Sequence, residues 1–450
     1  MYDSIIIGSG QAGVPLAVSL ADEGEEVALV EKNKLGGSCV NYGCTPSKAM
    51  ISSARRAWVA KNSRNMGVEV ENVSVDLEKI VERKDKIVKE FREGVAKRID
   101  KDNIDLFREK GKLLDNNEVK VGSETIEGEK IFINTGQSPF IPPIDGIEEV
   151  NFLTSSSIMN LKEAPESLIV IGGGYVGLEF GQAFHRFGSE VTIIERGSQL
   201  ASHEDEDIAS AIKYILEEES LEIYLESEAS EIKQKNNQVK LKISKEGKTK
   251  KLVADEVLVA AGRSPNTGDI GLENTKVKTT DGGYIETDNR FQTDDKNIWA
   301  LGDVRLGPAF THTSYEDYKV VMDNLYGDGE MTRSDRVLVY GMFIDPPLGR
   351  AGLSVGQAKS KDLDYEVVEY PMSYVARAIE LGEKKGKMKL VVEKESRKIL
   401  GAAILGYEGA ELIQVIAAYM NAGVKVDVVQ DAMAIHPTVV EGIQSLAKKF

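Results

Sequence analysis

The 450-residue sequence contains only two cysteines, 12 prolines and four histidines, and no apolar run is long enough to cross a membrane. Two cysteines cannot build a disulfide scaffold, and the ordinary composition excludes a collagen-like or disordered chain. The first residues carry neither the basic nor the apolar stretch of a secretory signal, so we expect a cytoplasmic protein. At about 150 residues per domain, the length predicts about three domains.

Basic residues are also scarce relative to acidic ones. The chain has 56 lysines and arginines against 73 aspartates and glutamates, which gives a net charge of −17. A protein that binds nucleic acid by neutralising phosphates needs the opposite balance, and an anionic membrane surface would repel this chain. We therefore expect neither a nucleic acid nor a membrane among its partners.

The chain begins with an apolar strand that runs into a glycine-rich turn, a helix and a second strand. The turn contains Gly8, Gly10 and Gly13, and the second strand ends at Glu31. This order is typical of a dinucleotide-binding unit, in which glycines let the backbone approach a pyrophosphate and the acid binds a ribose. A single turn of this kind is a weak signal.

The same order returns in the middle of the chain. Gly172, Gly174 and Gly177 follow a second apolar strand, and the next strand ends in Glu195. The first glycine and the acid are 23 positions apart in both copies. Two copies with matched spacing predict two dinucleotide sites, which suggests that two nucleotides exchange electrons in one chain.

The remaining segments predict an α/β protein of three domains. We expect two Rossmann-like dinucleotide-binding domains and a C-terminal α+β domain with several strands and one long helix. Residues 1–145 and 266–335 would form the first, with a central part, residues 146–265 the second and residues 336–450 the third. Apolar positions of residues 77–99 at helical spacing, Phe91 among them, predict a packed helix.

Both cysteines lie in one six-residue window, Cys39 and Cys44. A close cysteine pair in a cytoplasmic chain indicates redox chemistry or a metal site, and no histidine lies near enough in sequence to complete a zinc site. Residues 49–60 read as a helix that follows the pair. Positive partial charge at a helix N-terminus lowers the pKa of a thiol, so we expect reactive thiolates here.

The window GGSCVNYGCTPSK, residues 36–48, resembles the active-site signature of the class I pyridine nucleotide-disulfide oxidoreductases. This family includes dihydrolipoamide dehydrogenase, glutathione reductase and mercuric reductase. The segments INTG, AAGRSPNT, NIWALGD and AIHPTVVEG extend the resemblance over essentially the whole chain. It implies a homodimer with FAD at the first glycine turn and NADH, or NADPH, at the second.

The resemblance also implies a role for individual residues. Cys39 would meet the acceptor, and Cys44 would lie against the flavin and form its charge-transfer complex. Lys48 and Glu179 would form an ion pair beside the flavin. The partner subunit would supply His436 and Glu441 as an acid–base dyad. Further cofactor contacts would come from Gly37, Ser38, Thr135, Gly136, Gly262, Arg263 and Asp303.

The sequence also departs from known branches of the family. It has no C-terminal cysteine pair of the kind that delivers mercury, so we expect no efficient mercuric reductase and no resident metal. The segments around His312 look closer to a mercuric-reductase-like branch than to dihydrolipoamide dehydrogenase, and a substrate-side role for His312 stays open. The acceptor is a small disulfide or a thiol-binding metal ion. Dihydrolipoamide dehydrogenase, a mercuric or cupric reductase, and a slow redox-sensing flavoprotein remain alternatives. NADH is expected over NADPH, because Glu195 would repel a 2′-phosphate.

Overall fold

The computed structural model describes residues 1–236 and 238–450, and none of the helices in these residues is long and apolar enough to cross a membrane. The chain forms two compact units, each made of three separate segments. The first unit comprises residues 1–49, 79–140 and 262–336. The second comprises residues 50–78, 141–261 and 337–450. The three-domain boundaries expected from the sequence stay a prediction.

The first unit is built on a seven-stranded sheet in the order β3-β2-β1-β6-β5-β4, in which β16 also pairs with β6. Its strands are β1 (Tyr2–Ile7), β2 (Val27–Val30), β3 (Ile104–Phe107), β4 (Gly111–Leu113), β5 (Glu118–Val121), β6 (Glu124–Ile133) and β16 (Ile298–Ala300). The strands β3, β2, β1, β6 and β16 are parallel, and their apolar side chains are buried on both faces, as parallel sheets require.

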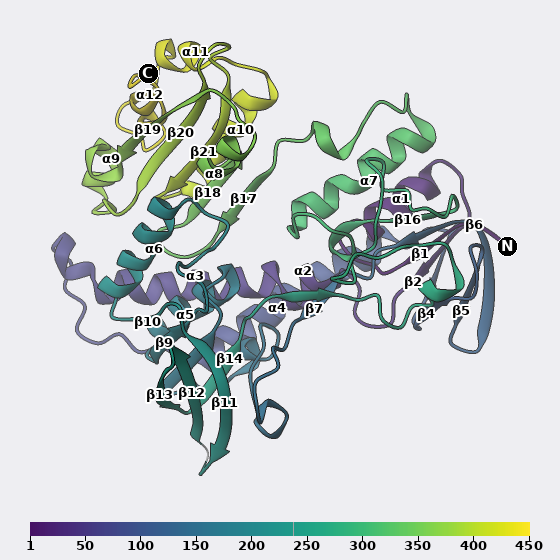
Figure 1. Ribbon diagram of the computed structural model, residues 1–450, viewed down its shortest axis with the longest axis horizontal. Coiled ribbons are helices and arrows are strands. Elements are labelled where there is room, and N and C mark those ends of the chain that lie inside the picture. The colour runs from purple at the N-terminus through teal and green to yellow at the C-terminus, as the bar shows by residue number, and fades with distance from the viewer. Residues whose placement is uncertain (237) are drawn as a thin grey trace. The chain divides into compact units, whose positions relative to one another are not determined.

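Helices cover one face of this sheet. Helix α1 (Gly13–Asp22) follows the first glycine turn and contacts α7 (Thr311–Tyr326), and Figure 1 shows the two side by side. Buried Leu16, Leu20 and Val320 belong to their shared core. Two short strands, β7 (Gln137–Pro139) and β15 (Arg263–Pro265), pair antiparallel at the point where the chain leaves and re-enters this unit.

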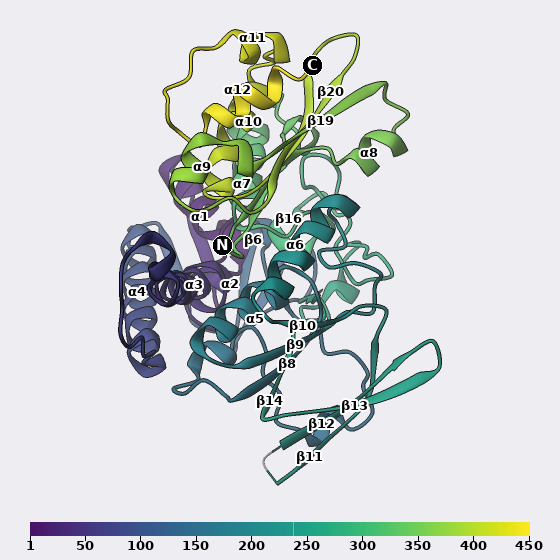
Figure 2. The same cartoon turned by 90° about the vertical axis from the view of Figure 1, so that its left-hand side faces the viewer.

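The second unit contains a parallel sheet in the order β10-β9-β8-β14 and a separate antiparallel sheet of β11, β12 and β13. These strands are β8 (Ser167–Ile171), β9 (Glu190–Ile194), β10 (Glu222–Tyr224), β11 (Glu228–Lys235), β12 (Gln238–Lys245), β13 (Lys248–Ala254) and β14 (Glu256–Val259). The helices that accompany these two sheets are α5 (Tyr175–Phe187) and α6 (Glu206–Glu218). One core joins both sheets, and Figure 2 shows β11, β12 and β13 as a twisted ribbon.

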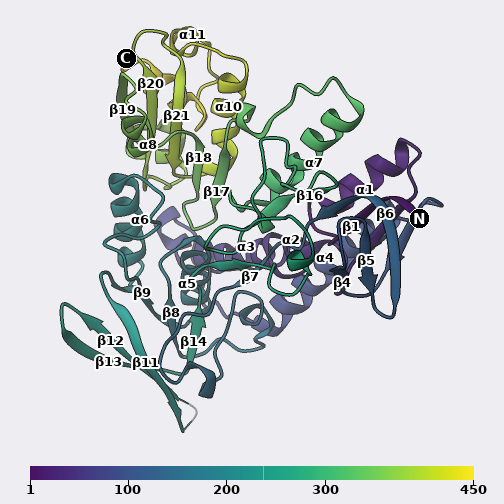
Figure 3. The same ribbon diagram turned by 45° about the vertical axis from the view of Figure 1, so that its right-hand side comes forward.

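The C-terminal part of the second unit is a five-stranded antiparallel sheet in the order β17-β18-β21-β20-β19 (Figure 3). Its strands are β17 (Val339–Met342), β18 (Leu348–Gly352), β19 (Tyr365–Pro371), β20 (Lys387–Glu393) and β21 (Ile399–Leu405). The helices are α8 (Val355–Ser360), α9 (Ala376–Glu380), α10 (Gly409–Asn421), α11 (Val426–Asp431) and α12 (Glu441–Ala447). Helices α10 and α12 pack on the sheet, so the expected mixed α+β arrangement is confirmed.

Three α-helices lie between β2 and β3. They are α2 (Gly37–Tyr42), α3 (Cys44–Lys61) and α4 (Leu77–Arg98). The predicted helix over residues 77–99 is confirmed, but the expectation that Phe91 packs is wrong, because 56% of its surface is exposed. The helix after the cysteines begins five residues earlier than its apolar pattern suggested, so Cys44 is its first residue.

Candidate functional site

The first glycine turn places backbone atoms so closely that side chains do not fit. Gly8 has a φ of +111°, and a Cβ atom there would lie 2.3 Å from the carbonyl oxygen of Asn134. A Cβ atom on Gly13 would lie 2.1 Å from the oxygen of Gly8. Only glycine meets both demands. The turn therefore leads directly from β1 into α1, as a nucleotide-binding turn does.

The predicted ribose acid of this turn is buried. Glu31 accepts hydrogen bonds from the backbone N–H of Ser9 (3.0 Å) and from its hydroxyl (2.7 Å), and a further one from the N–H of Asn33 (2.7 Å). These contacts hold the carboxylate at the end of β2, beside the turn.

The cysteine window packs on the same turn. Gly37 has a φ of +63°, and its Cβ atom would lie only 2.7 Å from Cα of Gly10. The N–H of Gly36 donates to the oxygen of Ser9 over 3.1 Å. The structure thus brings together the first glycine turn and the start of α2, which also contains Ser38. This close backbone packing forms a cradle that fits a flat dinucleotide cofactor.

The two cysteines contact each other as thiols and are not joined by a disulfide in this structure. Cys39 lies inside α2, and Cys44 is the exposed first residue of α3. A hydrogen bond with Cys44, and then burial, raise the pKa of the Cys39 thiol far above its usual range. The expected lowering of a thiol pKa by a helix N-terminus is therefore wrong for Cys39, since its neighbour Cys44 outweighs the backbone charge. The pair resists holding two negative charges at once.

Thr311 is a site residue that the sequence motifs missed. Its hydroxyl lies 3.1 Å from Sγ of Cys44, and it also bonds Cys39, where it lowers the thiol pKa in opposition to the larger effects. It is the first residue of α7, within the divergent segment FTHT that the sequence singled out only for His312. The ring of His312 stacks on Phe310, with centroids 5.7 Å apart. A role for His312 toward a substrate stays a prediction.

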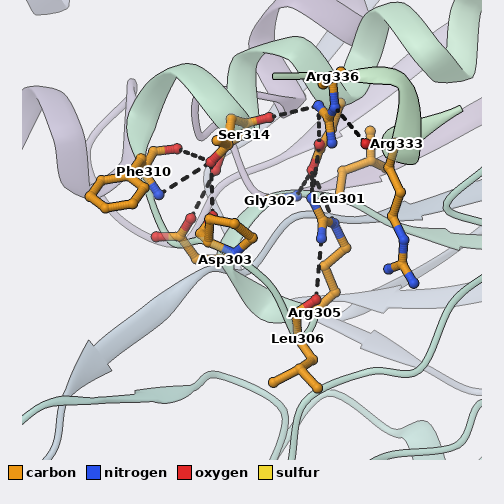
Figure 4. Close-up of polar contacts among 12 residues, drawn as sticks. Leu301, Gly302, Asp303, Arg305, Leu306, Phe310, Ser314, Arg333 and Arg336 are labelled. Atoms are coloured by element: carbon orange, nitrogen blue, oxygen red, sulfur yellow. Dashed lines mark hydrogen bonds and ion pairs between the residues drawn. The ribbon is translucent and has the colours of Figure 1, made fainter. Parts of the chain in front are cut away.

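Asp303 lies in a tight turn after β16, which Figure 4 shows in detail. Its carboxylate accepts a hydrogen bond from the hydroxyl of Ser314 (2.8 Å). Burial raises the pKa of Asp303, while Ser314 and the guanidinium of Arg263 oppose the rise. Gly302 has a φ of +70°, and its N–H donates to the buried carboxylate of Asp317 (2.9 Å).

Asp317 is itself neutralised by two arginines. Arg305 and Arg336 reach its two oxygens at 2.8 and 2.9 Å. Because Asp317 is fully buried, this pairing offsets the free energy of desolvating its charge.

Two predicted motifs that are far apart in sequence come together where β7 and β15 pair. The hydroxyl of Thr135 donates to the oxygen of Asn266 (2.9 Å), whose amide donates back to the oxygen of Thr135 (2.8 Å). The N–H of Asn266 bonds the oxygen of Gly136. Gly262 has a φ of +120°, and Arg263 is largely buried, which lowers its pKa.

The second glycine turn repeats the geometry of the first. Gly172 has a φ of +117°, and a Cβ atom on Gly177 would lie 2.0 Å from the oxygen of Gly172. Glu195 accepts one hydrogen bond from the N–H of Gly173 and one from that of Gly197, both over 2.7 Å. The predicted acid therefore lies directly against its glycine turn.

Two other predicted pairs differ in what the structure shows. His436 and Glu441 are brought together, with Nδ1 3.0 Å from a carboxylate oxygen, and their role as an acid–base dyad stays a prediction. Glu179 is buried on α5 and accepts a hydrogen bond from the N–H of Phe343 (2.8 Å). Lys48 belongs to α3 in the first unit, and its ion pair with Glu179 stays a prediction. Across residues 1–236 and 238–450, no group of three or more histidine, cysteine or acidic side chains forms a metal site.

Comparisons with known proteins place this geometry in a family. A family model described as pyridine nucleotide-disulphide oxidoreductase matches residues 2–317, and the dimerisation-domain model of that family matches residues 339–447. The chain is 35% identical to the probable pyridine nucleotide-disulfide oxidoreductase RclA of Escherichia coli, and the alignment covers 99% of this chain and 98% of RclA. It is 34% identical to mercuric reductase of Staphylococcus aureus, over 100% of this chain and 82% of that enzyme.

Solved structures give the same result. The HOCl-induced flavoprotein disulfide reductase RclA from Escherichia coli superposes with a TM-score of 0.90 at 34% identity, over 99% of both chains. A Cu(II) complex of that protein matches equally well. The expected fold, two dinucleotide-binding domains and a C-terminal dimerisation domain, is confirmed at the level of the family.

Proposed function

Because this chain belongs to the pyridine nucleotide-disulphide oxidoreductase family, we propose that Cys39 and Cys44 form its redox-active disulfide. The chain is a flavoprotein disulfide oxidoreductase that uses FAD and a pyridine nucleotide. The observation that supports this role is the contact of the two thiols with each other and with Thr311, beside the cradle formed by Gly10 and Gly37.

The proposed reaction balances in two halves. NADH and a proton reduce the Cys39–Cys44 disulfide to a dithiol and leave NAD⁺. Bound FAD would supply the two-electron chemistry that connects them. The dithiol then reduces an acceptor disulfide to two thiols and closes to the disulfide again. The Cys39 thiol donates a hydrogen bond to Cys44, which keeps the pKa of Cys39 high and leaves the negative charge on Cys44. Cys39 attacks the acceptor once a base has removed its proton.

Acid–base chemistry on the thiol side belongs to His436 and Glu441. The carboxylate orients the imidazole through Nδ1, which leaves Nε2 to exchange a proton with a thiol. Met433 and Ile435 beside the dyad are 99% and 78% exposed, and apolar side chains in that position favour cover by a second subunit. With the dimerisation-domain match, this supports a homodimer in which each subunit supplies the dyad to its partner.

The cofactor contacts follow the two glycine turns. FAD would bind at the first turn with Glu31 and Asp303, and the nicotinamide nucleotide at the second turn with Glu195. The hydrogen bonds from Gly173 and Gly197 hold the Glu195 carboxylate beside its turn, where it accepts from a ribose 2′-OH and repels a 2′-phosphate. NADH is therefore the proposed donor. Lys48 and Glu179 would pair beside the flavin.

The proposed acceptor is a small disulfide or a thiol-binding metal ion such as Cu(II). The Cu(II) complex of RclA supports the metal as an acceptor. Mercury is disfavoured, because the chain has only Cys39 and Cys44 and therefore no further thiols to deliver so tightly bound an ion. Dihydrolipoamide reduction, mercuric reduction and slow redox sensing are the competing functions that an acceptor screen separates.

Anaerobic reduction of purified protein with NADH tests the proposal. Wild type should develop long-wavelength charge-transfer absorbance and then oxidise NADH steadily with Cu(II) or a disulfide. Cys44→Ser should abolish the absorbance band, and Cys39→Ser should show it without any reductant. Reversed behaviour of the two variants would reverse their roles. Full acceptor turnover in Cys39→Ser would exclude the disulfide mechanism.

A further inference from the structure

Asn134 belongs to the INTG segment, in which the resemblance assigns a role to Thr135 and Gly136 but none to the asparagine. It directly follows β6 and is only 7% exposed. Strands β1 and β6 are parallel with Ile7 beside Ile133, and the N–H of Asn134 continues that ladder by donating to the oxygen of Ile7 (2.8 Å). The register therefore delivers the Asn134 side chain to the end of β1, where the first glycine turn begins.

The amide of Asn134 bonds two segments that are far apart in sequence. Its oxygen Oδ1 accepts a hydrogen bond from the N–H of Gly13 (3.0 Å), the first residue of α1. Its Nδ2 donates to the oxygen of Leu301 (2.8 Å), which begins the turn that leads to Asp303. One side chain thus joins the glycine turn to the Asp303 turn.

Glycines make room for this amide. A Cβ atom on Gly10 would lie 2.7 Å from Oδ1, and one on Gly302 would lie 2.7 Å from Nδ2. A Cβ atom on Gly13 would lie 3.0 Å from Oδ1. Two glycines of the cofactor turn therefore serve a second purpose, because they let a buried amide approach the backbone.

The Asp303 turn is held from its other side by α7. The N–H of Gly302 donates to Asp317. Figure 4 shows the hydroxyl of Ser314 directed to Asp303. Asn134 holds the other side of the turn through its hydrogen bond to the oxygen of Leu301. With both sides fixed, the Asp303 turn has a defined position relative to the first glycine turn.

The second glycine turn provides an internal comparison. Ala260 follows β14 at the corresponding position, since its N–H donates to the oxygen of Ile171 (2.8 Å) and its oxygen lies 2.3 Å from a Cβ atom built on Gly172. Alanine has no amide, and a Cβ atom on Gly174 would meet nothing within 4 Å. The connection through a side chain therefore exists only at the first turn.

We propose that Asn134 is a positioning residue for FAD. By bonding both Gly13 and Leu301, it fixes the first glycine turn relative to the Asp303 turn. These two turns form the FAD site, and a site fixed in advance favours a permanently bound cofactor. This inference rests on the proposed assignment of FAD to the first glycine turn, and Asn134 acts through those backbone groups without touching the cofactor.

FAD affinity of the apoprotein, measured by quenching of flavin fluorescence, tests the proposal. Asn134→Ala should weaken FAD binding about 10- to 100-fold, because two hydrogen bonds are lost and a buried carbonyl and N–H are left without partners. Asn134→Asp keeps an acceptor for Gly13 but turns an oxygen toward the oxygen of Leu301. Near neutral pH it should bind FAD at least as weakly as the alanine variant.

Acidification of Asn134→Asp distinguishes loss of the hydrogen bond to Leu301 from a loss of side-chain packing. At about pH 5 a buried aspartate in this position becomes protonated, and its O–H can donate to Leu301 as the amide does. FAD affinity relative to wild type should then recover about tenfold. The carboxyl groups of Asp303 and Asp317 also face this site in every variant, so wild type measured at each pH removes their contribution.

Asn103 provides the matched control. Its Nδ2 also donates to two backbone oxygens, those of Ala21 and Glu25, at the C-terminal end of α1. Asn103→Ala should therefore change FAD affinity less than about twofold while losing a comparable number of hydrogen bonds.

Three outcomes would overturn the proposal. They are an Asn134→Ala affinity within twofold of wild type, an Asn134→Asp affinity that does not recover on acidification, or an equal loss in Asn103→Ala. A Gly13→Ala reference distinguishes this failure from failure of the site assignment. If Gly13→Ala also binds FAD normally, FAD does not bind at the first turn. If Gly13→Ala binds FAD poorly, the assignment of FAD to the first turn stands and only the proposed role of Asn134 is wrong.

Discussion

The two glycine turns of this chain are nearly identical in backbone and different in surroundings. Gly8 and Gly172 have φ values of +111° and +117°. A Cβ atom on Gly13 would lie 2.1 Å from the oxygen of Gly8, and one on Gly177 would lie 2.0 Å from the oxygen of Gly172. The middle glycines differ, because only Gly10 meets a side chain. Similar local sequences thus form turns with the same backbone geometry. The residue after the neighbouring strand, Asn134 at the first turn and Ala260 at the second, makes their surroundings differ.

Under the proposed assignment of FAD to the first turn and the nicotinamide nucleotide to the second, this difference corresponds to different demands on the two cofactors. A flavin that stays bound gains from walls that are fixed in advance, whereas a nicotinamide nucleotide must enter and leave in every turnover. Asn134 connects the first turn to a second segment, and Ala260 leaves the second turn without such a connection.

The largest expected effect comes from the glycines that the two turns share. Gly13→Ala should reduce FAD affinity at least about 100-fold, because its Cβ atom would overlap a backbone oxygen that cannot move away. Gly177→Ala should yield a yellow protein that retains FAD but loses about 100-fold in kcat/KM for NADH. Flavin content after gel filtration and stopped-flow reduction by NADH measure the two effects. Loss of FAD from Gly177→Ala would mean that the two turns are not independent.

A smaller effect is expected from the two acids. Glu195→Gln should lower the ratio of kcat/KM for NADH to that for NADPH about tenfold, because the charge that repels a 2′-phosphate is removed. An amide oxygen can still accept from Gly173 or Gly197, so the turn should persist. Glu31→Gln at the first turn is the control and should leave the ratio unchanged. Steady-state kinetics with both nucleotides decide, and an unchanged ratio in Glu195→Gln would contradict the assignment.

The smallest expected effect is a change in melting temperature, and it concerns Asp303, an acid of the first unit. Burial raises its pKa above the unfolded-state value, so the stability it contributes is present in the protonated form at low pH. That stability is lost as the pH rises through the raised folded-state pKa. Asp303→Asn does not titrate there, and near neutral pH its apoprotein should melt at the wild-type temperature or about 2 °C above it. Its FAD affinity should nevertheless fall about tenfold.

Melting curves of the two apoproteins from acidic to neutral pH check this sign. The difference in Tm in favour of Asp303→Asn should grow as the pH rises. A difference that instead shrinks with rising pH would mean that the charged carboxylate stabilises the fold.

Much of the architecture was accessible from local sequence. Apolar runs that end in glycines predicted β1 and β8, and the spacing from Gly8 to Glu31 and from Gly172 to Glu195 predicted two similar units. These features are local, since a strand, a turn and the start of a helix are set by residues within a few positions of each other. The proximity of His436 and Glu441 belongs to the same class.

The sequence by itself therefore determined which turns and strands form, and that Cys39 and Cys44 lie side by side. The tertiary structure alone decided that Thr311 reaches Cys44 and that Asn134 bonds both Gly13 and Leu301. These partners are more than 100 positions apart, and they meet because strands align in a parallel register and α7 packs behind the sheet. Burial of Phe91 failed as a prediction for the same reason, because helical spacing defines a face of a helix but only packing decides how much of it is covered.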